Sequence, residues 1–412
     1  MTTRSGRHFL QLPGPTNVPE RVRRAMDRAV IDHRGPEFAE LTLAVLEELK
    51  PVFKTAGTVF AFPSSATGAW EAALVNTLSP GDGVLAFERG FFADKWAEVA
   101  SRLGLDVDLV PGDWRAGVEP QLVEDRLRRD RDGRIRAVMV VHNETSTGVT
   151  TDLPDIRAAI DAAGHPALFM VDTVSSLASI DFRHDEWGVD VTVTGSQKGL
   201  MLPPGLGFTA AGERALAARP AHPLPHSYFN WEDHLAANAS GFFPYTPATT
   251  LLFGLRESLA MLAEEGLDHV FARHRRFAGA TRAAVAAWGL ECYGANACEH
   301  SNSLTAVLLP DGHDANALRE VVLERFDMSL GTGLGKLDGR VFRIGHLGDL
   351  NELTLAGTLA GVEMGLRLAR VPHGGGGVEA ALDHLAMASL PAGQEMTDIT
   401  SHSPMISHPG ER

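Results

Sequence analysis

The amino-acid sequence predicts an α/β protein with a large domain built on a mostly parallel sheet and a smaller C-terminal α+β domain. Up to about residue 250, short apolar runs rich in β-branched residues alternate with longer amphipathic runs. Beyond that point two long helical patterns come first, and strand-like runs are fewer. Apolar strands that alternate with helices are typical of a parallel sheet covered on both faces. A chain of 412 residues is long enough for two or three domains.

The elements of the large domain follow in order along the chain. Its strands are predicted at 58–62, 83–87, 137–142, 167–171, 189–194 and 206–210, where apolar and β-branched residues dominate. Amphipathic runs between them predict helices at 68–78, 92–103, 119–129 and 153–163. No internal repeat interrupts this alternation.

The chain after about residue 250 shows a different order of elements. We expect helices at 251–265 and 269–288, a strand at 304–309, a helix at 316–326, a strand at 341–344 and a helix at 352–369. Four consecutive glycines within 371–377 favour a flexible link to a last helix at 378–388. A phosphate site at this glycine run is the minor alternative, because no strand clearly precedes it.

These patterns divide the chain into four parts. They are an N-terminal segment at 1–19, a large domain at 20–265, a small C-terminal domain at 266–392 and a flexible tail at 393–412. The tail is polar and carries proline and glycine, and it does not end in Ser-Lys-Leu.

Composition excludes several classes of function. The formal net charge of −15 argues against non-specific binding to nucleic acid or to anionic membranes. No apolar run approaches the length of a membrane span, and the basic start lacks the apolar segment of a secretory signal. Cys292 and Cys298 are the only cysteines, so a disulfide framework is absent and we expect a cytoplasmic protein.

The strand at 189–194 is followed by Gly-Ser-Gln-Lys at 195–198. A lysine just beyond a buried strand, among small residues, can form a Schiff base with a carbonyl, which is the chemistry of pyridoxal phosphate (PLP) enzymes. Most lysines at such positions are solvated surface charges. Lys198 is therefore a candidate only if the chain supplies the other parts of a PLP site.

Two further strand ends offer such parts. Ser65, Ala66 and Thr67 precede a predicted helix, whose first N–H groups and dipole favour an anion. An ordinary N-cap loop is the alternative. Asp172 directly follows the strand at 167–171, and a carboxylate there could keep a pyridine nitrogen protonated, or serve as an N-cap or metal ligand. The carboxyl ends of parallel strands meet at one edge, where ligands bind.

Three more segments carry candidates. The polar run 142–148, which contains Thr145, ends another strand and could line the cofactor ring or simply form a turn. One ring of Phe91 and Phe92 could stack on the cofactor, or both could pack in the core. Arg343 lies between apolar residues of a strand, where its guanidinium needs either a substrate carboxylate or a structural acid.

Taken together, these motifs resemble the class V aminotransferases of PLP fold type I, and most of all the serine–, alanine– and aspartate–glyoxylate aminotransferases. The resemblance covers about residues 10–385. It is carried by the segments 12–19, 32–36, 66–71, 142–145, 185–190, 195–198, 244–247 and 342–348.

The resemblance implies a role for each candidate. Lys198 would carry PLP and Asp172 would face its pyridine nitrogen. The phosphate would be held by Ser65, Ala66, Thr67 and Gln197. Phe92 would stack on the ring, Thr145 would lie near its phenolic oxygen, and Arg343 would bind the substrate carboxylate. Thr246 would reach the partner's phosphate across the interface of a homodimer. Two departures concern cofactor fit, namely Thr173 where relatives often have glycine, and Ser64-Ser65-Ala66 in place of a Thr/Ser-Gly pattern.

The expected reaction is PLP-dependent transamination from L-serine to glyoxylate, giving hydroxypyruvate and glycine, with Lys198 moving the proton. Alanine–glyoxylate or aspartate–glyoxylate transfer is the alternative. Aspartate would need a second cationic group, which His33 or Arg34 could provide.

Three rival classes are disfavoured. A cysteine desulfurase needs a cysteine on a loop shortly before the arginine, and 327–339 has none. A non-enzymatic PLP-fold protein would be expected to lack Lys198, Asp172 or Arg343. A metal site is the third alternative, because His222, His226 and His234 lie near Glu232 and Asp233. Their spacing does not match a helical His-Glu-x-x-His site, and Pro223 and Pro225 would break a helix, so we expect no metal.

Overall fold

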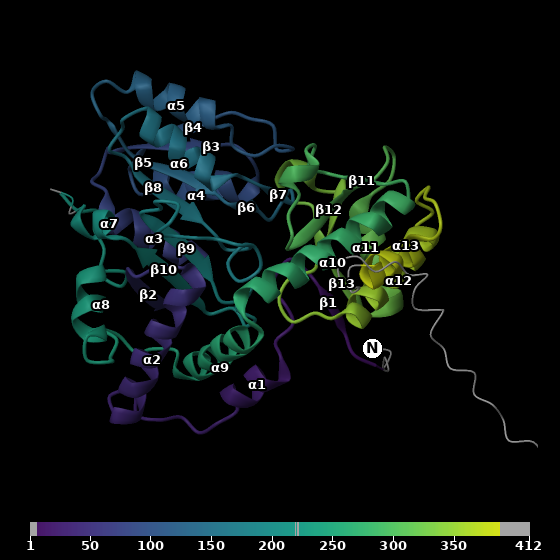
Figure 1. Cartoon of the computed structure of the whole chain (residues 1–412), viewed down its shortest axis with the longest axis horizontal. Helices are drawn as coiled ribbons and strands as arrows, with labels where there is room; N and C mark the ends of the chain where they lie inside the picture. Colours follow the sequence, from purple (N-terminus) through teal and green to yellow (C-terminus); the bar gives the residue numbers. More distant parts are fainter. Residues whose placement is uncertain (1–5, 219, 221, 388–412) are drawn as a thin grey trace, which may run out of the picture.

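The computed structural model describes residues 6–218, 220 and 222–387. The tail predicted at 393–412 and the last residue of the helix predicted at 378–388 therefore lie outside the described residues. Two sheets of different size organise the described chain, and they lie side by side in Figure 1. Within the described residues no helix combines the length and apolar character needed to cross a membrane.

The larger sheet has seven strands in the order β2-β10-β9-β8-β5-β3-β4. Neighbours from β9 to β4 are parallel, while β10 runs antiparallel to both β9 and β2. The mostly parallel sheet predicted from the sequence is thus confirmed. The strands are β2 (Thr58–Pro63), β3 (Gly83–Phe87), β4 (Asp106–Val110), β5 (Ile135–Val141), β8 (Leu168–Asp172), β9 (Val191–Gly195) and β10 (Leu206–Ala211).

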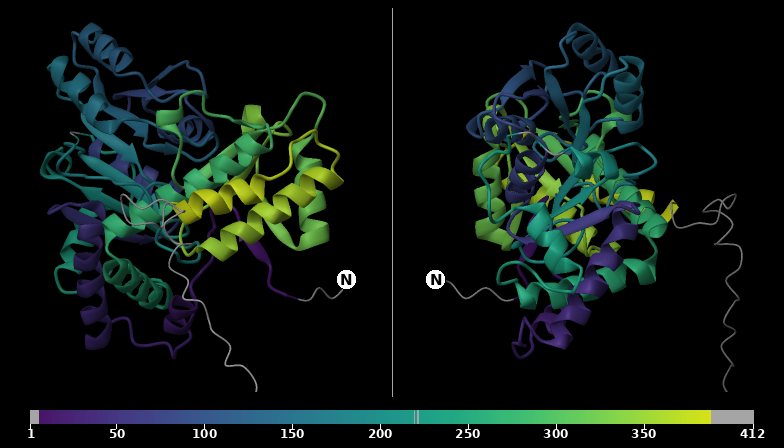
Figure 2. Two further views of the ribbon diagram at one scale, coloured as in Figure 1. Left: turned by 45° about the vertical axis from the view of Figure 1, so that its right-hand side comes forward. Right: turned by 90° about the vertical axis from the view of Figure 1, so that its left-hand side faces the viewer.

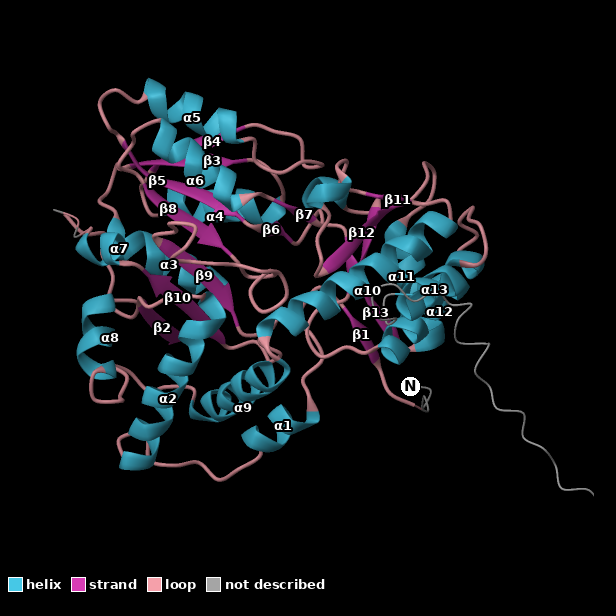
Figure 3. Ribbon diagram, in the orientation of Figure 1, coloured by secondary structure: helices cyan, strands magenta, loops and turns pink. Residues whose placement is uncertain are grey.

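Helices cover both faces of this sheet (Figure 3). Successive strand residues point to opposite faces, so Phe60 and Phe62 join the core on one face while Val59 and Ala61 join the other. The first face is covered by α3 (Ala66–Thr77) and α4 (Phe91–Arg102). The second is covered by α2 (Pro36–Phe53), α5 (Pro120–Arg129), α6 (Leu153–Ala162) and α9 (Thr249–Glu265). The remaining helices of this part are α1 (Glu20–Met26), α7 (Glu213–Ala217) and α8 (Trp231–Asn238).

The smaller sheet has the order β1-β13-β14-β12-β11. Its strands are β1 (Phe9–Gln11), β11 (Glu291–Cys292), β12 (Leu304–Leu308), β13 (Met328–Thr332) and β14 (Val341–Gly345). They pack against α10 (Leu267–Ala287), α11 (Ala315–Phe326), α12 (Glu352–Leu368) and α13 (Gly377–Met387) in a core of their own. The yellow α13 runs alongside α10 in Figures 1 and 2.

The chain's start belongs to this smaller sheet. β1 pairs in parallel with β13, so that Phe9 lies opposite Met328. The chain then crosses to α1 and the larger sheet (Figure 1). A short hairpin of β6 (Asn143–Glu144) and β7 (Val149–Thr150) follows β5 at the edge that faces the smaller sheet. The N-terminal loop and this hairpin therefore both lie where the two sheets come together.

Candidate active site

The site forms where parallel strands end. Asp172 is the last residue of β8, and Lys198 follows β9 by three residues. β8 and β9 are paired in parallel, so their carboxyl ends lie at one edge. Arg343 on β14 and Glu144 on β6 lie close enough to shift the pKa of Lys198, downward and upward respectively. The four ionisable groups therefore form one cluster, brought together from both sheets.

Lys198 is buried against the N-terminal loop. Its side chain is 7% exposed, and its Nζ donates a hydrogen bond to the carbonyl oxygen of Pro13. A Cβ on Gly14 would stand 2.4 Å from Lys198 Cδ, so this loop can touch the lysine only through glycine. Burial, followed by the nearby Arg343 charge, lowers the pKa of Lys198 to about 7. An amine with that pKa is largely neutral just above neutrality and can act as a nucleophile or base.

The same loop fixes the backbone around the lysine. The N–H of Thr16 donates to Gln197 O at 3.1 Å, and its hydroxyl donates to Lys198 O at 3.1 Å. A Cβ on Gly345 would lie 2.1 Å from Leu12 O, so the loop also presses against the end of β14. The motif at 12–19 thus has a structural role, since it joins the turn that contains Lys198 to the strand that contains Arg343.

Asp172 has both carboxylate oxygens engaged. Oδ1 accepts from the Val174 N–H at 2.7 Å, and Oδ2 accepts from Trp70 Nε1 at 2.7 Å. Burial raises the pKa of Asp172 to about 7, against the effect of these two donors. Sequence reasoning singled out Asp172 but not its partner Trp70, although Trp70 stands in the motif at 66–71.

The start of α3 has the features of an anion site. No side chain caps this helix, and in the described residues no acceptor meets the backbone N–H groups of Ser65, Ala66 and Thr67. Gln197 lies beside it, because a Cβ on Gly195 would be 3.0 Å from Gln197 Oε1 and 3.3 Å from Ala66 Cβ. Gln197 Oε1 is buried without a partner among the described residues. Gln197 and the start of α3, both predicted to hold a phosphate, thus lie on either side of Gly195, whose missing Cβ leaves room between them.

Glu144 organises the adjoining wall. Its buried carboxylate accepts from the N–H groups of Phe92 at 3.4 Å and Ala93 at 3.1 Å, and from Ser146 Oγ at 2.6 Å. Burial raises the pKa of Glu144. A carboxylate at the first turn of a helix satisfies its free N–H groups. Glu144 therefore fixes the start of α4 and with it Phe92, whose ring meets Phe91 edge-on at 5.5 Å. No local pattern in the sequence indicates this role.

Arg343 is held by backbone carbonyls instead of by an acid. Its Nε donates to Thr332 O at 2.7 Å and its Nη1 to Thr145 O at 2.7 Å. The side chain is 7% exposed, and among the described residues no carboxylate oxygen lies within ion-pair distance of it. Burial lowers its pKa to about 10, which still leaves it charged at neutral pH. The structural ion pair considered from the sequence is absent from the described residues, and Nη2 remains for another acceptor.

Thr145 connects this arginine to Asn143 and Ser175. Thr145 Oγ1 donates to Ser175 Oγ at 2.7 Å, and Asn143 Nδ2 donates to Ser175 Oγ at 2.7 Å and to Ser303 Oγ at 2.9 Å. Ser303 immediately precedes β12 of the smaller sheet. This buried chain of polar groups links the two sheets behind the site, and neither serine was singled out from the sequence.

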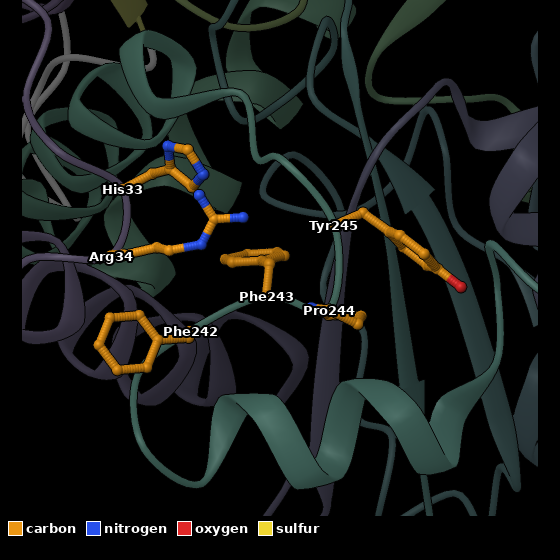
Figure 4. A pocket seen from close by; sticks show the side chains of 6 residues that line it. All are labelled: His33, Arg34, Phe242, Phe243, Pro244 and Tyr245. Atoms are coloured by element: carbon orange, nitrogen blue, oxygen red, sulfur yellow. The ribbon is translucent and has the colours of Figure 1, made fainter.

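Thr246, His33 and Arg34 belong to other segments of the chain. Thr246 is exposed in the loop before α9. Next to it in the chain, a pocket of about 320 Å³ is lined by His33, Arg34, Phe242, Phe243, Pro244 and Tyr245. Figure 4 shows both basic side chains and the Phe243 ring around this hollow. Tyr245 stacks on Tyr228 at 5.1 Å, and Tyr228 Oη donates to Pro63 O at 3.4 Å, at the end of β2 and shortly before α3.

The residues of the rival hypotheses lie elsewhere. Cys292 is on β11 at the far edge of the smaller sheet, and Cys298 is exposed beyond it, so neither precedes Arg343 closely. His234 packs its ring against Phe62 and Phe243. In the described part of the chain, no group of three or more histidine, cysteine or acidic side chains could hold a metal ion.

A comparison with protein families decides the class. The sequence model of the family described as Aminotransferase class-V matches residues 8–334. The chain belongs to this family. A serine–glyoxylate aminotransferase from Methylorubrum extorquens is 49% identical to this class-V aminotransferase over 395 residues, which are 93% of this chain and 97% of that protein. An L-aspartate–glyoxylate aminotransferase from Paracoccus denitrificans is 46% identical over 383 residues, 92% of this chain and 97% of that protein.

The structures of class-V relatives agree with this assignment. The crystal structure of ureidoglycine–glyoxylate aminotransferase from Bacillus subtilis matches with a TM-score of 0.86 and 29% identity, covering 94% of this chain and 100% of that chain. The predicted PLP fold type I and the prediction of an aminotransferase are confirmed.

Proposed function

We propose that this class-V aminotransferase uses PLP to transfer the amino group of L-serine to glyoxylate, giving hydroxypyruvate and glycine. The observation that carries the proposal is the buried cluster of Lys198, Asp172 and an arginine without an acidic partner, at one sheet edge. The 49% identity to a serine–glyoxylate aminotransferase over 93% of the chain supports this choice of substrates.

The residues present fit the proposed cofactor. The unmatched N–H groups of α3, with Ser65, Thr67 and the amide of Gln197, provide donors for a phosphate. Phe92 would stack on the ring, and Thr145 would lie near its phenolic oxygen. When bound, PLP supplies an electron-withdrawing ring that stabilises negative charge formed at the substrate's α-carbon.

The chain's own groups divide the remaining work. Asp172 would hold a proton on the ring nitrogen, because a buried carboxylate beside that nitrogen favours its protonated form. Arg343 would bind the α-carboxylate of the donor through the face of its guanidinium that the Thr145 and Thr332 carbonyls leave free. Lys198 would take the proton from the α-carbon at its Nζ, a step that its pKa of about 7 allows near neutral pH.

A second candidate is transfer from L-aspartate. It is favoured by the 46% identity to an L-aspartate–glyoxylate aminotransferase and by the pocket that holds His33 and Arg34. Aspartate carries a second carboxylate, so a second cation should face it. These two residues line the pocket with Phe242 and Phe243, and neither affects the pKa of Lys198 or Arg343, which is why serine is preferred.

A donor panel tests the proposal. L-Serine, L-alanine and L-aspartate are each supplied with glyoxylate, and glycine and the matching keto acid are measured. We expect the largest kcat/KM for serine. If glycine forms only when aspartate is the donor, the second candidate is established. If glycine formation does not depend on serine, the first candidate is excluded.

We further propose a cytoplasmic homodimer, in which Thr246 contacts the phosphate bound by the partner subunit. Its exposure in the loop before α9 leaves it accessible to a second copy. The proposed domain limits remain 20–265 and 266–392, with a segment at 1–19 whose strand β1 pairs with the smaller sheet.

A further inference from the structure

Trp70 contacts Asp172 from a different element of the fold. It lies on α3, it is 4% exposed, and its indole Nε1 donates to Asp172 Oδ2 at 2.7 Å across 102 residues of sequence. Its ring stacks on Trp96 of α4 at 6.0 Å with an interplanar angle of 16°. The indole is therefore fixed by packing on one side and by the carboxylate on its edge.

We propose that Trp70 is a positioning residue that holds the Asp172 carboxylate, through its indole N–H, in the orientation and charge state that the cofactor's ring nitrogen requires. This inference rests on the proposed use of PLP. An ionised carboxylate accepts up to about four hydrogen bonds. Val174 N–H and Trp70 Nε1 occupy one site on each oxygen, which fixes the plane of the group and leaves acceptor capacity for a third donor.

The charge state follows from the groups that face Asp172. Burial favours its neutral form, and the nearby Glu144 acts in the same direction. The Val174 and Trp70 donors and the Lys198 charge favour the ionised form. Removing the indole donor therefore shifts the balance towards a neutral carboxyl group, which cannot stabilise a proton on the ring nitrogen.

Because Trp70 lies on α3, this helix contacts Asp172 as well as forming the proposed phosphate site. The first turn of α3 presents the N–H groups of Ala66 and Thr67 to the proposed phosphate site, and the next turn carries Trp70. One rigid helix thus relates the site for the phosphate to the carboxylate for the ring nitrogen. A shift of α3 would disturb both contacts together.

The chain offers a matched control. Trp96 is 1% exposed, stacks on the same ring, and its Nε1 is buried without an acceptor among the described residues. Trp70→Phe and Trp96→Phe therefore delete the same group from neighbouring rings, but only the first removes a hydrogen bond to Asp172. Any general effect of a smaller core ring should appear in both variants.

The first measurement needs no cofactor. In a proton–nitrogen correlation spectrum of the cofactor-free protein, the Trp70 indole resonance should move with pH, with a midpoint near the Asp172 pKa of about 7. Its assignment comes from its loss in Trp70→Phe and, independently, from its displacement in Asp172→Asn. The Trp96 resonance should show no such titration. A Trp70 resonance that does not respond to pH, or that is unchanged in Asp172→Asn, overturns the inference.

The second measurement is the dissociation constant of PLP as a function of pH. Trp70→Phe should weaken binding about fivefold at pH 7 and about tenfold at lower pH, because losing one donor to a charged group raises the Asp172 pKa of about 7 by about one unit. The pH at which affinity falls should move upward by the same amount. Trp96→Phe should stay within about twofold of the unmodified protein. Lys198 titrates in the same range and its charge is coupled to that of Asp172, so it is the comparison with Trp96→Phe that isolates the effect of the lost donor.

The outcomes separate the two proposals. If the unmodified protein binds no PLP, the proposed function fails and the inference fails with it. If it binds PLP but Trp70→Phe and Trp96→Phe lose affinity equally, Trp70 is only a packing residue and the inference alone is overturned.

Discussion

Replacing Arg343 by lysine tests the proposed carboxylate site directly. The guanidinium is anchored by Thr332 O and Thr145 O at 2.7 Å each, and no acid pairs with it in the described residues. A lysine keeps the positive charge but cannot hold two carbonyls and a planar carboxylate with one ammonium group. The loss of about one charge-assisted hydrogen bond, about 1.5–3 kcal/mol, should lower kcat/KM for serine about 10- to 100-fold.

The assay compares two donors and two variants. L-Serine is compared with ethanolamine, which is serine without its carboxylate, in the half-reaction that consumes the donor. Arg319→Lys serves as the control, because Arg319 is a neighbouring arginine that also donates to a β13 carbonyl, Leu330 O at 2.8 Å, while its other hydrogen bond goes to Asn316 and not to a site residue. The expected loss appears only for Arg343→Lys and only with serine. An equal loss with ethanolamine, or a serine kcat/KM that stays within about threefold, would refute the carboxylate assignment.

Three further predictions follow from the same contacts. The rate at which Lys198 captures PLP should rise with pH through about 7 and then level off, because its depressed pKa makes the amine neutral above that value; absorbance stopped-flow measures this, and a rise that continues towards the ordinary lysine range would contradict it. Glu144→Ala should lower the unfolding free energy by about 1–2 kcal/mol, because α4 loses its cap. Asp314→Ala, which removes an exposed cap of α11, should lower it less. Equal denaturation midpoints for the two variants would argue against this role of Glu144. Gly14→Ala should impair PLP uptake, since its Cβ would stand 2.4 Å from Lys198 Cδ. Gly81→Ala is the control, because Gly81 also has a positive φ but has open space around it, so PLP uptake should be retained. Equal PLP occupancy of the two variants after dialysis would show that the contact does not matter.

The sequence predicted best those elements whose signal is local. The strand predicted at 83–87 coincides with β3, all of whose residues are buried. The edge strand β4 was missed, because Asp106 and Asp108 alternate with valine and leucine in a strand that is mostly exposed or half-buried. The helix α2 was also missed, although its buried face is apolar; prolines stand at its first position and near its end.

The candidate site divides in the same way. Lys198 and Asp172 can be identified from the sequence, because each is a polar residue that directly follows an apolar strand. The groups that hold them cannot, because Pro13 is 185 residues from Lys198 and Trp70 is 102 residues from Asp172. Thr145 O and Arg343 are 198 residues apart. No local pattern encodes such distant contacts, and only the family motifs indicated that these segments meet.

The N-terminal loop also sets the order in which the site can be completed during synthesis. Its residues leave the ribosome well before those of β13, with which β1 pairs, since Phe9 lies opposite Met328, more than 300 residues later. Contacts of such long sequence range form late, because the loop between them must close first. A nascent chain therefore lacks the Pro13 wall of the Lys198 pocket until the smaller sheet exists. PLP capture by Lys198 therefore indicates that the strands of the smaller sheet have folded. Removal of about the first fifteen residues should abolish this capture, although it deletes no residue that takes part in the reaction.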